Sequence, residues 1–389
     1  METRSAHQSH PGAQICPVRF TGRGWDYAKI WSLNLALTLA SLGLFLPWAR
    51  VRTRRYFLGQ IQVQGIGFDY QADPRALLLG WAVIGLVFTL LGWFSDQLAA
   101  ALTALLATER DRWLLVVSLS LGLALLVQGL PFSWVLVQSL RYNASRTSHR
   151  NIRFGFGSRR ERWRLWREMV VVLLLRLLVP LSLGLLQPYV AWRWRRLLIS
   201  HRRFGTTPFQ FTATPAEYAR LHLRALPLLL LAVSLWLPFL VLSFLVGQSF
   251  TSGEPVPSLT APVLVLVLLL SLLLSLLLGL VWSCWLEAAA ANLTWRSIRL
   301  GELRFESRWR ARDLLALRLR LGLTMLVSLG LAWPWARIVS TRYRLERISI
   351  SPAEALGGFL AGEEERLSAL AEGGFTLDDA LSGIIDISL

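Results

Sequence analysis

Four long stretches without a charged residue constrain the fold of this chain more than any other feature. They are 20 to 32 residues long and lie at Ala76–Ser95, Trp113–Leu140, Ala225–Gly253 and Pro255–Leu286. A helix needs about 20 apolar residues to cross the hydrocarbon core of a bilayer, and each stretch reaches that length. The sequence therefore predicts an all-α polytopic membrane protein, with two spanning helical hairpins over about 76–140 and 225–286.

The composition supports the same class of protein. The chain has 389 residues, of which 54% are hydrophobic and 17% charged, with a formal charge of +17. Soluble domains have about 45–50% apolar and about 25% charged residues, so an ordinary soluble enzyme is excluded. The two cysteines, Cys16 and Cys284, are far apart and indicate no disulfide framework or metal site. The first 30 residues lack the apolar core of a cleavable signal peptide.

Three further apolar stretches share one interruption. Ser-Leu-Gly-Leu occurs at 41–44, 182–185 and 328–331, and a proline followed by an aromatic residue comes four positions after each glycine. The shared break motif consists of Gly43, Pro47, Trp48, Gly184, Pro188, Tyr189, Gly330, Pro334 and Trp335. Such a match indicates internal duplication, with repeats over about 20–70, 154–211 and 305–350.

The length of these three stretches suggests that they enter the membrane and return. Leu177–Trp192 and Leu321–Ala336 have 16 residues each, which as helix cover about 24 Å of a ~30 Å core. Ile30–Ala49 has 20 residues and is long enough to span. If all seven stretches span, the arginine-rich segments fall on both sides, against the positive-inside rule. Re-entrant segments place every arginine-rich segment, and both termini, in the cytoplasm. Re-entry is the favoured topology, and seven spans is the alternative.

A phenylalanine recurs twelve residues beyond Tyr56, Tyr142, Leu197 and Leu293, at Phe68, Phe154, Phe209 and Phe305. Three of the four are followed two residues later by another aromatic residue. This period of two predicts short β-like strands on the cytoplasmic side. The alternative is that the aromatic residues anchor helix ends at the membrane interface.

The basic residues are almost all arginine, since Lys29 is the one lysine among 41 basic residues. Genome composition could produce this bias. Arginine is also suited to bidentate contacts with phosphate, including lipid headgroups, and here it lies beside tryptophans next to apolar stretches. This pattern is more typical of a membrane surface than of nucleic-acid binding. The arginines predicted to face lipid are Arg50, Arg52, Arg54, Arg55, Arg193, Arg195, Arg196, Arg337 and Arg342.

Few polar residues interrupt the apolar stretches. Asn34, Thr38 and Gln128 are the candidates for a polar site within the membrane. Asn34 and Thr38 lie four residues apart, on one helical face, and could instead bond backbone groups freed at the Gly43 break. We find no catalytic motif and no metal-ligand spacing, so we expect no enzyme activity, cofactor or metal.

The two ends of the chain differ from its centre. Residues 1–19 are predicted to be a disordered tail, residues 20–351 the membrane domain, and residues 352–389 a flexible acidic tail. That last segment has eight acidic residues and one basic residue, Arg366. A solvated tail is the simple interpretation; docking on a basic partner or on the arginine face of the same chain is the alternative.

Several of these blocks together resemble the YjgN family of bacterial inner-membrane proteins of unknown function. The similar segments are Phe20-Thr21-Gly22, Trp31, Asn34, Leu37-Thr38, Pro47-Trp48-Ala49-Arg50, Arg55-Tyr56, Gly65, Phe68, Leu140-Arg141-Tyr142-Asn143 and Arg203-Phe204-Gly205-Thr206-Thr207-Pro208-Phe209. The resemblance implies a bacterial inner-membrane location and a shared fold, but no reaction. It also points to a membrane metallopeptidase as a partner.

The sequence leads to two functional hypotheses. The first is a non-enzymatic membrane organiser whose cytoplasmic arginine- and tryptophan-rich face binds anionic lipid, or a protein partner. The alternative is a small-solute transporter or channel that uses the broken, repeated helices, because broken helices and internal repeats are common in transporters.

Overall fold

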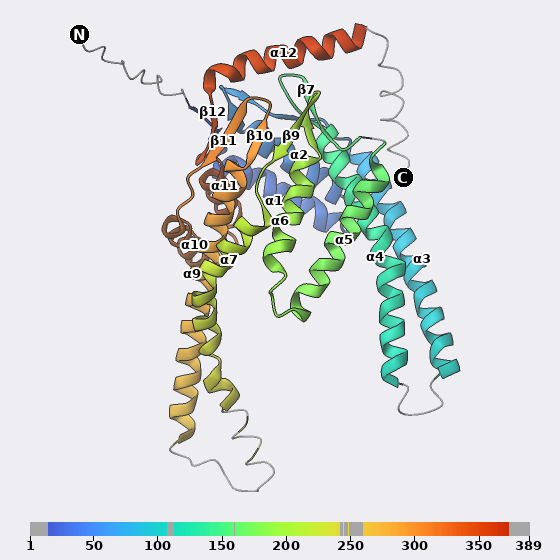
Figure 1. Cartoon of the computed structure of the whole chain (residues 1–389), viewed down its shortest axis with the longest axis vertical. Coiled ribbons are helices and arrows are strands. Elements are labelled where there is room, and N and C mark those ends of the chain that lie inside the picture. The colour runs from blue at the N-terminus through green and yellow to red at the C-terminus, as the bar shows by residue number, and fades with distance from the viewer. Residues whose placement is uncertain are drawn as a thin grey trace, which may run out of the picture. The chain divides into compact units, whose positions relative to one another are not determined.

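The computed structural model describes residues 15–106, 113–158, 160–241, 244, 248 and 260–372. The chain divides into two compact units. Unit 1 comprises residues 1–212, 298–305 and 333–389, and unit 2 comprises residues 213–297 and 306–332. Figure 1 shows the elements of both, and each unit is described by itself.

Unit 1 combines helices with short strands. Its helices are α1 (Gly24–Ala40), α2 (Leu46–Gly59), α3 (Pro74–Leu106), α4 (Trp113–Ser145), α5 (Arg162–Leu181), α6 (Gln187–Ser200), α11 (Trp333–Leu345) and α12 (Ala353–Glu372). Its strands are β1 (Cys16–Pro17), β2 (Arg19–Phe20), β3 (Ile61–Val63), β4 (Ile66–Gly67), β5 (Asp69–Tyr70), β6 (Thr147–His149), β7 (Ile152–Phe156), β8 (Arg202–Phe204), β9 (Thr207–Phe211), β10 (Ile298–Leu300), β11 (Leu303–Ser307, whose last two residues belong to unit 2) and β12 (Ile348–Ser351).

The strands of the described residues form two sheets. Nine strands follow one another in the order β1-β12-β11-β10-β9-β8-β7-β6-β5, and β2-β3-β4 form a second sheet. Phe154, Phe209 and Phe305 lie within β7, β9 and β11, and Phe68 lies between β4 and β5. Four of the helices, α2, α4, α6 and α9 (Thr260–Arg296, of unit 2), lead directly into a β-hairpin.

The four hairpins turn at equivalent positions. The residue eight positions after Tyr56, Tyr142, Leu197 and Leu293 has a positive φ in each case: 52° at Gln64, 50° at Arg150 and 58° at both Gly205 and Gly301. A two-residue hairpin turn needs this left-handed conformation to match the twist of its strands. The tight turn therefore recurs even where the residue is glutamine or arginine.

The Ser-Leu-Gly-Leu segments have one common backbone geometry. Leu42, Leu183 and Leu329 each have φ 50°, and Gly43, Gly184 and Gly330 have φ of 93°, 85° and 87°. Each glycine N–H donates to the carbonyl five residues earlier, at 2.8 to 2.9 Å. This is the closing bond of a Schellman helix end, with leucine at the left-handed position that glycine usually occupies.

The repeated spacing of serine and proline in these segments has a structural role. Ser41, Ser182 and Ser328 accept the backbone N–H four residues later, at 2.9, 3.2 and 3.0 Å. The serine thus satisfies an N–H at the start of the next helix, and Pro47 and Pro188 occupy its first turn, where a proline is tolerated. Each segment ends one helix and starts another. Helices α1 and α2 pack on each other after the break, as do α5 and α6 (Figure 1).

The core of unit 1 includes a cluster of buried hydrophobic residues that packs against β7. Val137, Phe156, Leu165, Met169 and Leu197 are buried together, and join α4, β7, α5 and α6. Burying a large apolar side chain is worth about 1.5–3 kcal/mol. This cluster therefore fixes α4 against the first strand of the β7–β8 pair.

Unit 2 is helical in its described residues, apart from the end of β11. It contains α7 (Pro215–Ser234), α9 and α10 (Ala311–Val327), and α9 packs on both α7 and α10. Thr214 caps α7 reciprocally with Glu217, a capping box that satisfies two N–H groups of the first turn. Arg318 of α10 is paired with Glu287 of α9 and donates to Ser283 Oγ at 3.0 Å.

Three helical segments of the described residues are long and apolar enough to cross a membrane: Pro74–Ala101, Pro215–Val241 and Val265–Arg296. The mostly helical fold with membrane-spanning helices agrees with the sequence. The predicted stretch Trp113–Leu140 lies in α4, which packs on α3. Residues 242–243, 245–247 and 249–259 of the second predicted hairpin lie outside the described residues.

The ends of the chain differ from the tails that the sequence suggested. Residues 16–20, partly within the expected disordered segment 1–19, form β1 and β2. The first part of the expected flexible segment 352–389 forms α12, because the buried Glu363 carboxylate bonds to Thr207 of β9 and the apolar Leu356 and Leu360 are buried. Residues 1–14 and 373–389 lie outside the described residues.

Candidate functional site

Unit 1 contains a cavity of about 1240 Å³ that extends along α3 and reaches α2, α4, β7 and β8. Its lining contains seven arginines and, among the described residues, no aspartate or glutamate. The arginines are Arg50 and Arg54 of α2, Arg141 of α4, Arg146 directly after α4, Arg153 of β7, Arg160 between β7 and α5, and Arg203 of β8. A concave surface that concentrates one sign of charge attracts ions of the opposite sign. The cavity is therefore a candidate site for an anion.

Arg54 is held in place by a network at the wall of the cavity. Its guanidinium donates to the side-chain oxygen of Asn143 and, at 3.2 Å, to the hydroxyl of Tyr70. Tyr70 in turn donates to the same Asn143 oxygen at 3.1 Å. Three elements, α2, β5 and α4, thus meet at one arginine. An arginine fixed in this way loses less side-chain entropy when it binds a ligand.

Arg203 reaches the cavity across a glycine. Gly155 of β7 pairs with Arg203 of β8 in the sheet. A Cβ atom at position 155 would lie 2.3 Å from Arg203 Nε, so the side chain occupies the space that a larger residue would fill. Glycine at this position lets the guanidinium cross the strand.

Aromatic rings accompany two more of the arginines. The Arg50 guanidinium lies 5.3 Å from the ring centre of Trp81, and the Arg146 guanidinium lies 5.4 Å from that of Tyr142. Cation–π contacts of this kind are worth about 0.5–2 kcal/mol. They orient the cations while consuming none of their N–H donors, which stay available for phosphate or carboxylate oxygens.

The nine arginines predicted to face lipid have different surroundings in the structure. Arg50 and Arg54 line the cavity. Other members of that set bond within the protein: Arg52 to Asn34, Arg55 to the Tyr70 carbonyl, Arg193 to the Tyr189 hydroxyl, Arg337 to the Tyr27 hydroxyl and Arg342 to the Gly22 carbonyl. Arg196 lies over the ring of Trp192 at 5.2 Å.

The three polar residues proposed within the membrane are not brought together. Asn34 is buried and joins α1 to α2, donating to the Ala49 carbonyl and to Thr53 Oγ1, both at 3.4 Å. The Thr38 carbonyl accepts the Gly43 N–H. Gln128 lies on α4 and has no described hydrogen bond to either residue. The Asn34 side chain thus links α1 to α2, and Thr38 contributes its backbone carbonyl to the helix break.

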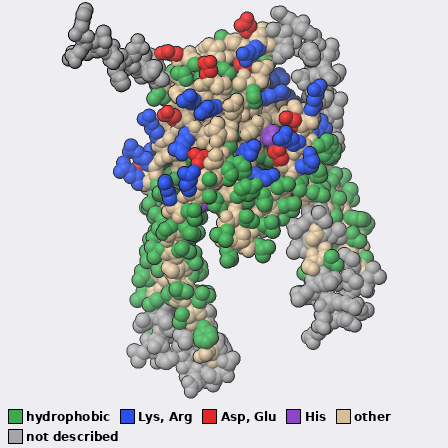
Figure 2. Space-filling model, viewed as in Figure 1, with side chains coloured by type: hydrophobic (Ala, Val, Ile, Leu, Met, Phe, Trp, Pro, Cys, Tyr) green, Lys and Arg blue, Asp and Glu red, His purple; other side chains and the backbone are tan. Residues whose placement is uncertain are grey.

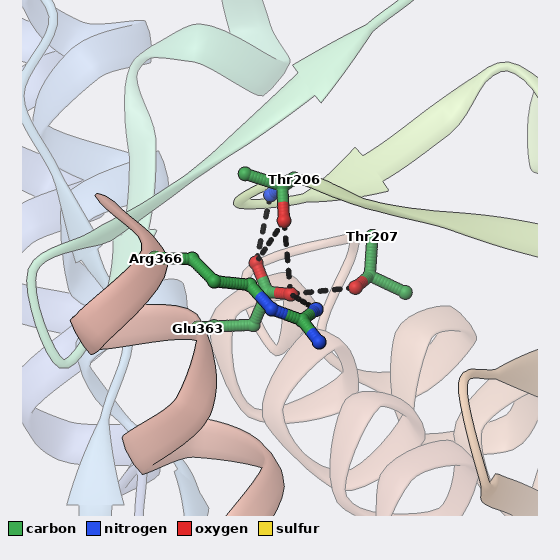
Figure 3. A network of polar contacts seen from close by, with 4 residues as sticks. All are labelled: Thr206, Thr207, Glu363 and Arg366. Carbon is green, nitrogen blue, oxygen red and sulfur yellow. Dashed lines mark hydrogen bonds and ion pairs between the residues drawn. The ribbon is translucent and has the colours of Figure 1, made fainter. Parts of the chain in front are cut away.

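A buried glutamate that no sequence motif marks lies at the centre of a polar network with Thr206, Thr207 and Arg366 (Figure 3). Glu363 of α12 is 1% exposed and accepts the Thr206 N–H at 2.7 Å and the Thr207 hydroxyl at 2.6 Å. Arg366 donates to it at 3.1 Å. Burial alone would raise the pKa of the Glu363 carboxyl, but the bonds from Thr207, Thr206 and Arg366 together lower it.

This contact brings α12 to the cavity. Leu367, one turn beyond Glu363, lines it together with Gly205 of the β8–β9 turn. Since the Glu363 pKa is lowered, its contribution to docking is complete above the ordinary value of 4.5 and is lost as the pH falls through the folded value. Glu363 lies in a run of three glutamates. The sequence signal that could have distinguished it is its spacing of three and seven from the apolar residues Leu360 and Leu356.

Charge and hydrophobicity are segregated in unit 1. Figure 2 shows Lys and Arg side chains gathered over the region of the strands, and hydrophobic side chains along α3. Along α3, large side chains such as Leu79, Leu86 and Leu90 are exposed. Exposed apolar faces of this extent are typical of lipid contact. Fold and surface together define a helical integral membrane protein with an arginine-lined cavity.

Comparisons with known proteins give the family. Residues 16–377 match the family described as bacterial protein of unknown function (DUF898), and the chain belongs to it. Inner membrane protein YjgN of Salmonella typhimurium (strain LT2) is 24% identical over 355 residues, which cover 82% of this chain and 84% of the relative. The proteins of the same name from Escherichia coli O157:H7 and K12 are 27% and 28% identical over 137 residues, or 35% of this chain and 30% of each relative. No solved structure matches this chain.

Proposed function

We propose that this protein is a non-enzymatic membrane organiser that binds the anionic headgroups of membrane lipids in its arginine-lined cavity. The observation that supports this best is the seven-arginine lining without an acidic residue among the described residues. Guanidinium groups match phosphate in a planar, bidentate geometry and are only weakly hydrated. A lipid phosphate is the anion available in high concentration beside a helical membrane protein.

The proposed position in the membrane gives the cavity access to headgroups. In this arrangement α3 with α4, and α7 with α9, are spanning hairpins, and the Ser-Leu-Gly-Leu segments turn back within one leaflet. Basic residues are enriched on the cytoplasmic side, so we assign the strands, the arginines and both termini to that side. The cavity arginines then lie at the level of the cytoplasmic headgroups.

The leucines at the helix breaks support re-entry. Leu42, Leu183 and Leu329 have positive φ and are 95%, 92% and 91% exposed. A bulky residue rarely adopts this conformation, and a leucine in water forgoes about 1.5–3 kcal/mol of burial. If lipid hydrocarbon surrounds each break, the free-energy cost of exposing leucine to water disappears at all three positions.

Re-entry is tested by measuring depth with a nitroxide at position 183, in a chain with Cys16 and Cys284 replaced by alanine. We expect oxygen, which concentrates in hydrocarbon, to relax this label more than a water-soluble nickel complex does. A label at Gln210, on β9, serves as the control and should show the reverse. Equal access of the nickel complex to both labels would rule out re-entry.

Headgroup binding is tested by native mass spectrometry of protein exchanged from mixed phosphatidylglycerol and phosphatidylcholine. The wild type should retain phosphatidylglycerol preferentially. Changing Arg54, Arg153 and Arg203 to glutamine should lower its retention at least about tenfold, because charge-assisted bonds to phosphate are lost. The control changes three exposed arginines outside the cavity, Arg164, Arg308 and Arg312, and removes the same charge. Equal loss in both triple variants would refute a specific site.

A measurement of solute flux distinguishes the transporter hypothesis from the organiser hypothesis. Proteoliposomes of the purified protein should not accelerate the efflux of small entrapped anions such as phosphate. The contacts of Asn34 and Thr38 fit a structural role at the break, and an organiser requires no solute path. Efflux that is abolished by changing Asn34 to alanine, in a protein that remains folded, would favour the transporter.

A further inference from the structure

The cavity has a second property that a headgroup site does not require: it continues along a candidate spanning helix. Its α3 wall runs from Ala76 to Phe88, thirteen residues, whose first and last Cα atoms as helix lie about 18 Å apart along the axis. All of this wall belongs to the segment Pro74–Ala101, which is long and apolar enough to cross a membrane. A phosphate fills only a small part of that length.

The chemistry of the wall changes along the helix. The Arg50 guanidinium of α2 lies over the ring of Trp81, partway along the α3 wall. Beyond Trp81 the α3 side of the wall is apolar, with Val83, Ile84, Val87 and Phe88, and the facing wall on α4 includes Pro131 and Val135. Tryptophan is enriched at the boundary between headgroups and hydrocarbon. Arg50 of α2 thus meets the uncharged α3 wall at the residue type that marks this boundary.

Space for a chain is provided by two glycines of α3. Gly80 and Gly85 both line the cavity, and no atom lies within 4 Å of where their Cβ atoms would be. Val83 and Val87 are 40% and 42% exposed. The apolar wall is therefore a surface that a hydrocarbon chain can reach and cover, directly continuous with the arginines.

We infer that the ligand of this cavity is an intact anionic phospholipid, with its phosphate among the arginines and one acyl chain along α3 between Gly80 and Phe88. The inference rests on the proposed function and goes beyond it, since headgroup binding alone leaves the apolar wall empty. Charge complementarity selects the anionic headgroup, and the uncharged wall selects an alkyl chain over a second phosphate or a sugar. A water-soluble phosphate ester would contact the arginine end alone.

The wild-type protein provides the first test, which needs no substitution. In detergent, we compare the binding of dioleoyl-phosphatidylglycerol, dihexanoyl-phosphatidylglycerol and glycerol 1-phosphate by native mass spectrometry and by competition. The long-chain lipid should bind at least about tenfold more tightly than either short probe, because each buried methylene adds to affinity. Equal affinities for all three probes would overturn the inference while leaving headgroup binding intact.

Substitutions provide the second test. Changing Gly80 to phenylalanine, or Val87 to tryptophan, fills the apolar wall and leaves every arginine in place. Either change should lower retention of dioleoyl-phosphatidylglycerol about tenfold and leave binding of glycerol 1-phosphate unchanged. Leu86→Trp and Leu90→Trp are the controls, because both residues are exposed on α3 outside the cavity lining, and they should retain the lipid.

The outcomes separate the two proposals. If the wall-filling variants retain the lipid and the arginine variants lose it, the chain lies elsewhere and only the headgroup proposal survives. If neither set of variants changes retention, both proposals fail. Thermal unfolding in detergent identifies any variant that has lost its fold. In that case the comparison of the three probes with the wild-type protein tests the inference without any substitution.

Discussion

Thr206 donates its backbone N–H to the carboxylate of Glu363 at 2.7 Å, across 157 residues of sequence. The bond attaches α12 to the β8–β9 turn, where Gly205 has a positive φ and its own N–H donates to the Arg153 carbonyl at 3.0 Å. The ring of Phe359, on the same helix, lies 6.2 Å from that of Phe204. A C-terminal helix is thereby fixed to the turn that borders the arginine-lined cavity.

Replacing Glu363 by glutamine should loosen α12. The change removes the negative charge that the donor groups of Thr206, Thr207 and Arg366 share and presents an NH2 group to them, which should cost about 1–3 kcal/mol of docking free energy. We expect faster proteolysis within 353–372 in detergent, measured by mass spectrometry of the fragments. Glu364→Gln is the control, because Glu364 is exposed. Equal cleavage rates in wild type and Glu363→Gln would show that the bond contributes nothing to docking.

The stability of unit 1 should fall in mild acid because of His149. Burial lowers the pKa of this buried imidazole, Arg150 adds to the effect, and the bond to the Gly67 carbonyl opposes it. The unfolded chain therefore binds a proton that the folded chain resists, so stability is lost as the pH falls below about 6.5. His149→Gln should flatten the dependence of the unfolding temperature on pH between 8 and 5.5. An unchanged slope would contradict this origin.

Enlarging Gly155 should remove Arg203 from the cavity without changing any charge. In Gly155→Ala the new methyl group would lie 2.3 Å from Arg203 Nε, so the flexible side chain must move. We expect retention of phosphatidylglycerol to fall about threefold to tenfold. In an Arg203→Gln background the same change should have little further effect, since coupled residues are not additive. Full additivity of the two changes would mean that Gly155 acts through something other than Arg203.

A side chain at the left-handed glycines of the breaks should destabilise the protein. No atom lies within 4 Å of a Cβ built at Gly184, and its φ is 85°, so Gly184→Ala is penalised by backbone conformation alone. The expected destabilisation is about 1–2 kcal/mol, seen as a lower unfolding temperature in detergent. Gly92→Ala, in the regular helix α3 with equal space, should be neutral or stabilising by up to about 1 kcal/mol. The same loss at both positions would argue against the left-handed turn.

The helical part of the fold could be read from the sequence because its physical signals are local. Charge-free stretches predict spanning helices, and a Ser-Leu-Gly-Leu segment followed by proline contains the cap, the left-handed glycine and the helix start within seven residues. The positions of the hairpin turns could be predicted from the sequence only in part. Gly205 and Gly301 suit a positive φ, but Gln64 and Arg150 adopt it without a sequence signal, because pairing of the flanking strands overrides local preference.

The candidate site was harder to predict than the helices. Arg50 and Arg54 were singled out as lipid-facing, but their meeting with Arg153 and Arg203 depends on strand pairing between distant segments. Asn143 orients Arg54 from 89 residues away. The spacing of Glu363 from Leu360 and Leu356 is compatible with the buried face of α12, but its partners Thr206 and Thr207 lie 157 and 156 residues earlier in the sequence. Periodicity and spacing do not encode such long-range contacts.

The position of a lipid phosphate tests the central claim most directly. An experimental structure of the protein in nanodiscs containing phosphatidylglycerol, solved by electron cryomicroscopy, would show what occupies the cavity. We predict density for a phosphate within hydrogen-bonding distance of the guanidinium groups of Arg54 and Arg203, continuing as a chain along α3. Lipid density confined to the outer surface of the helices, with no phosphate among these arginines, would contradict the account.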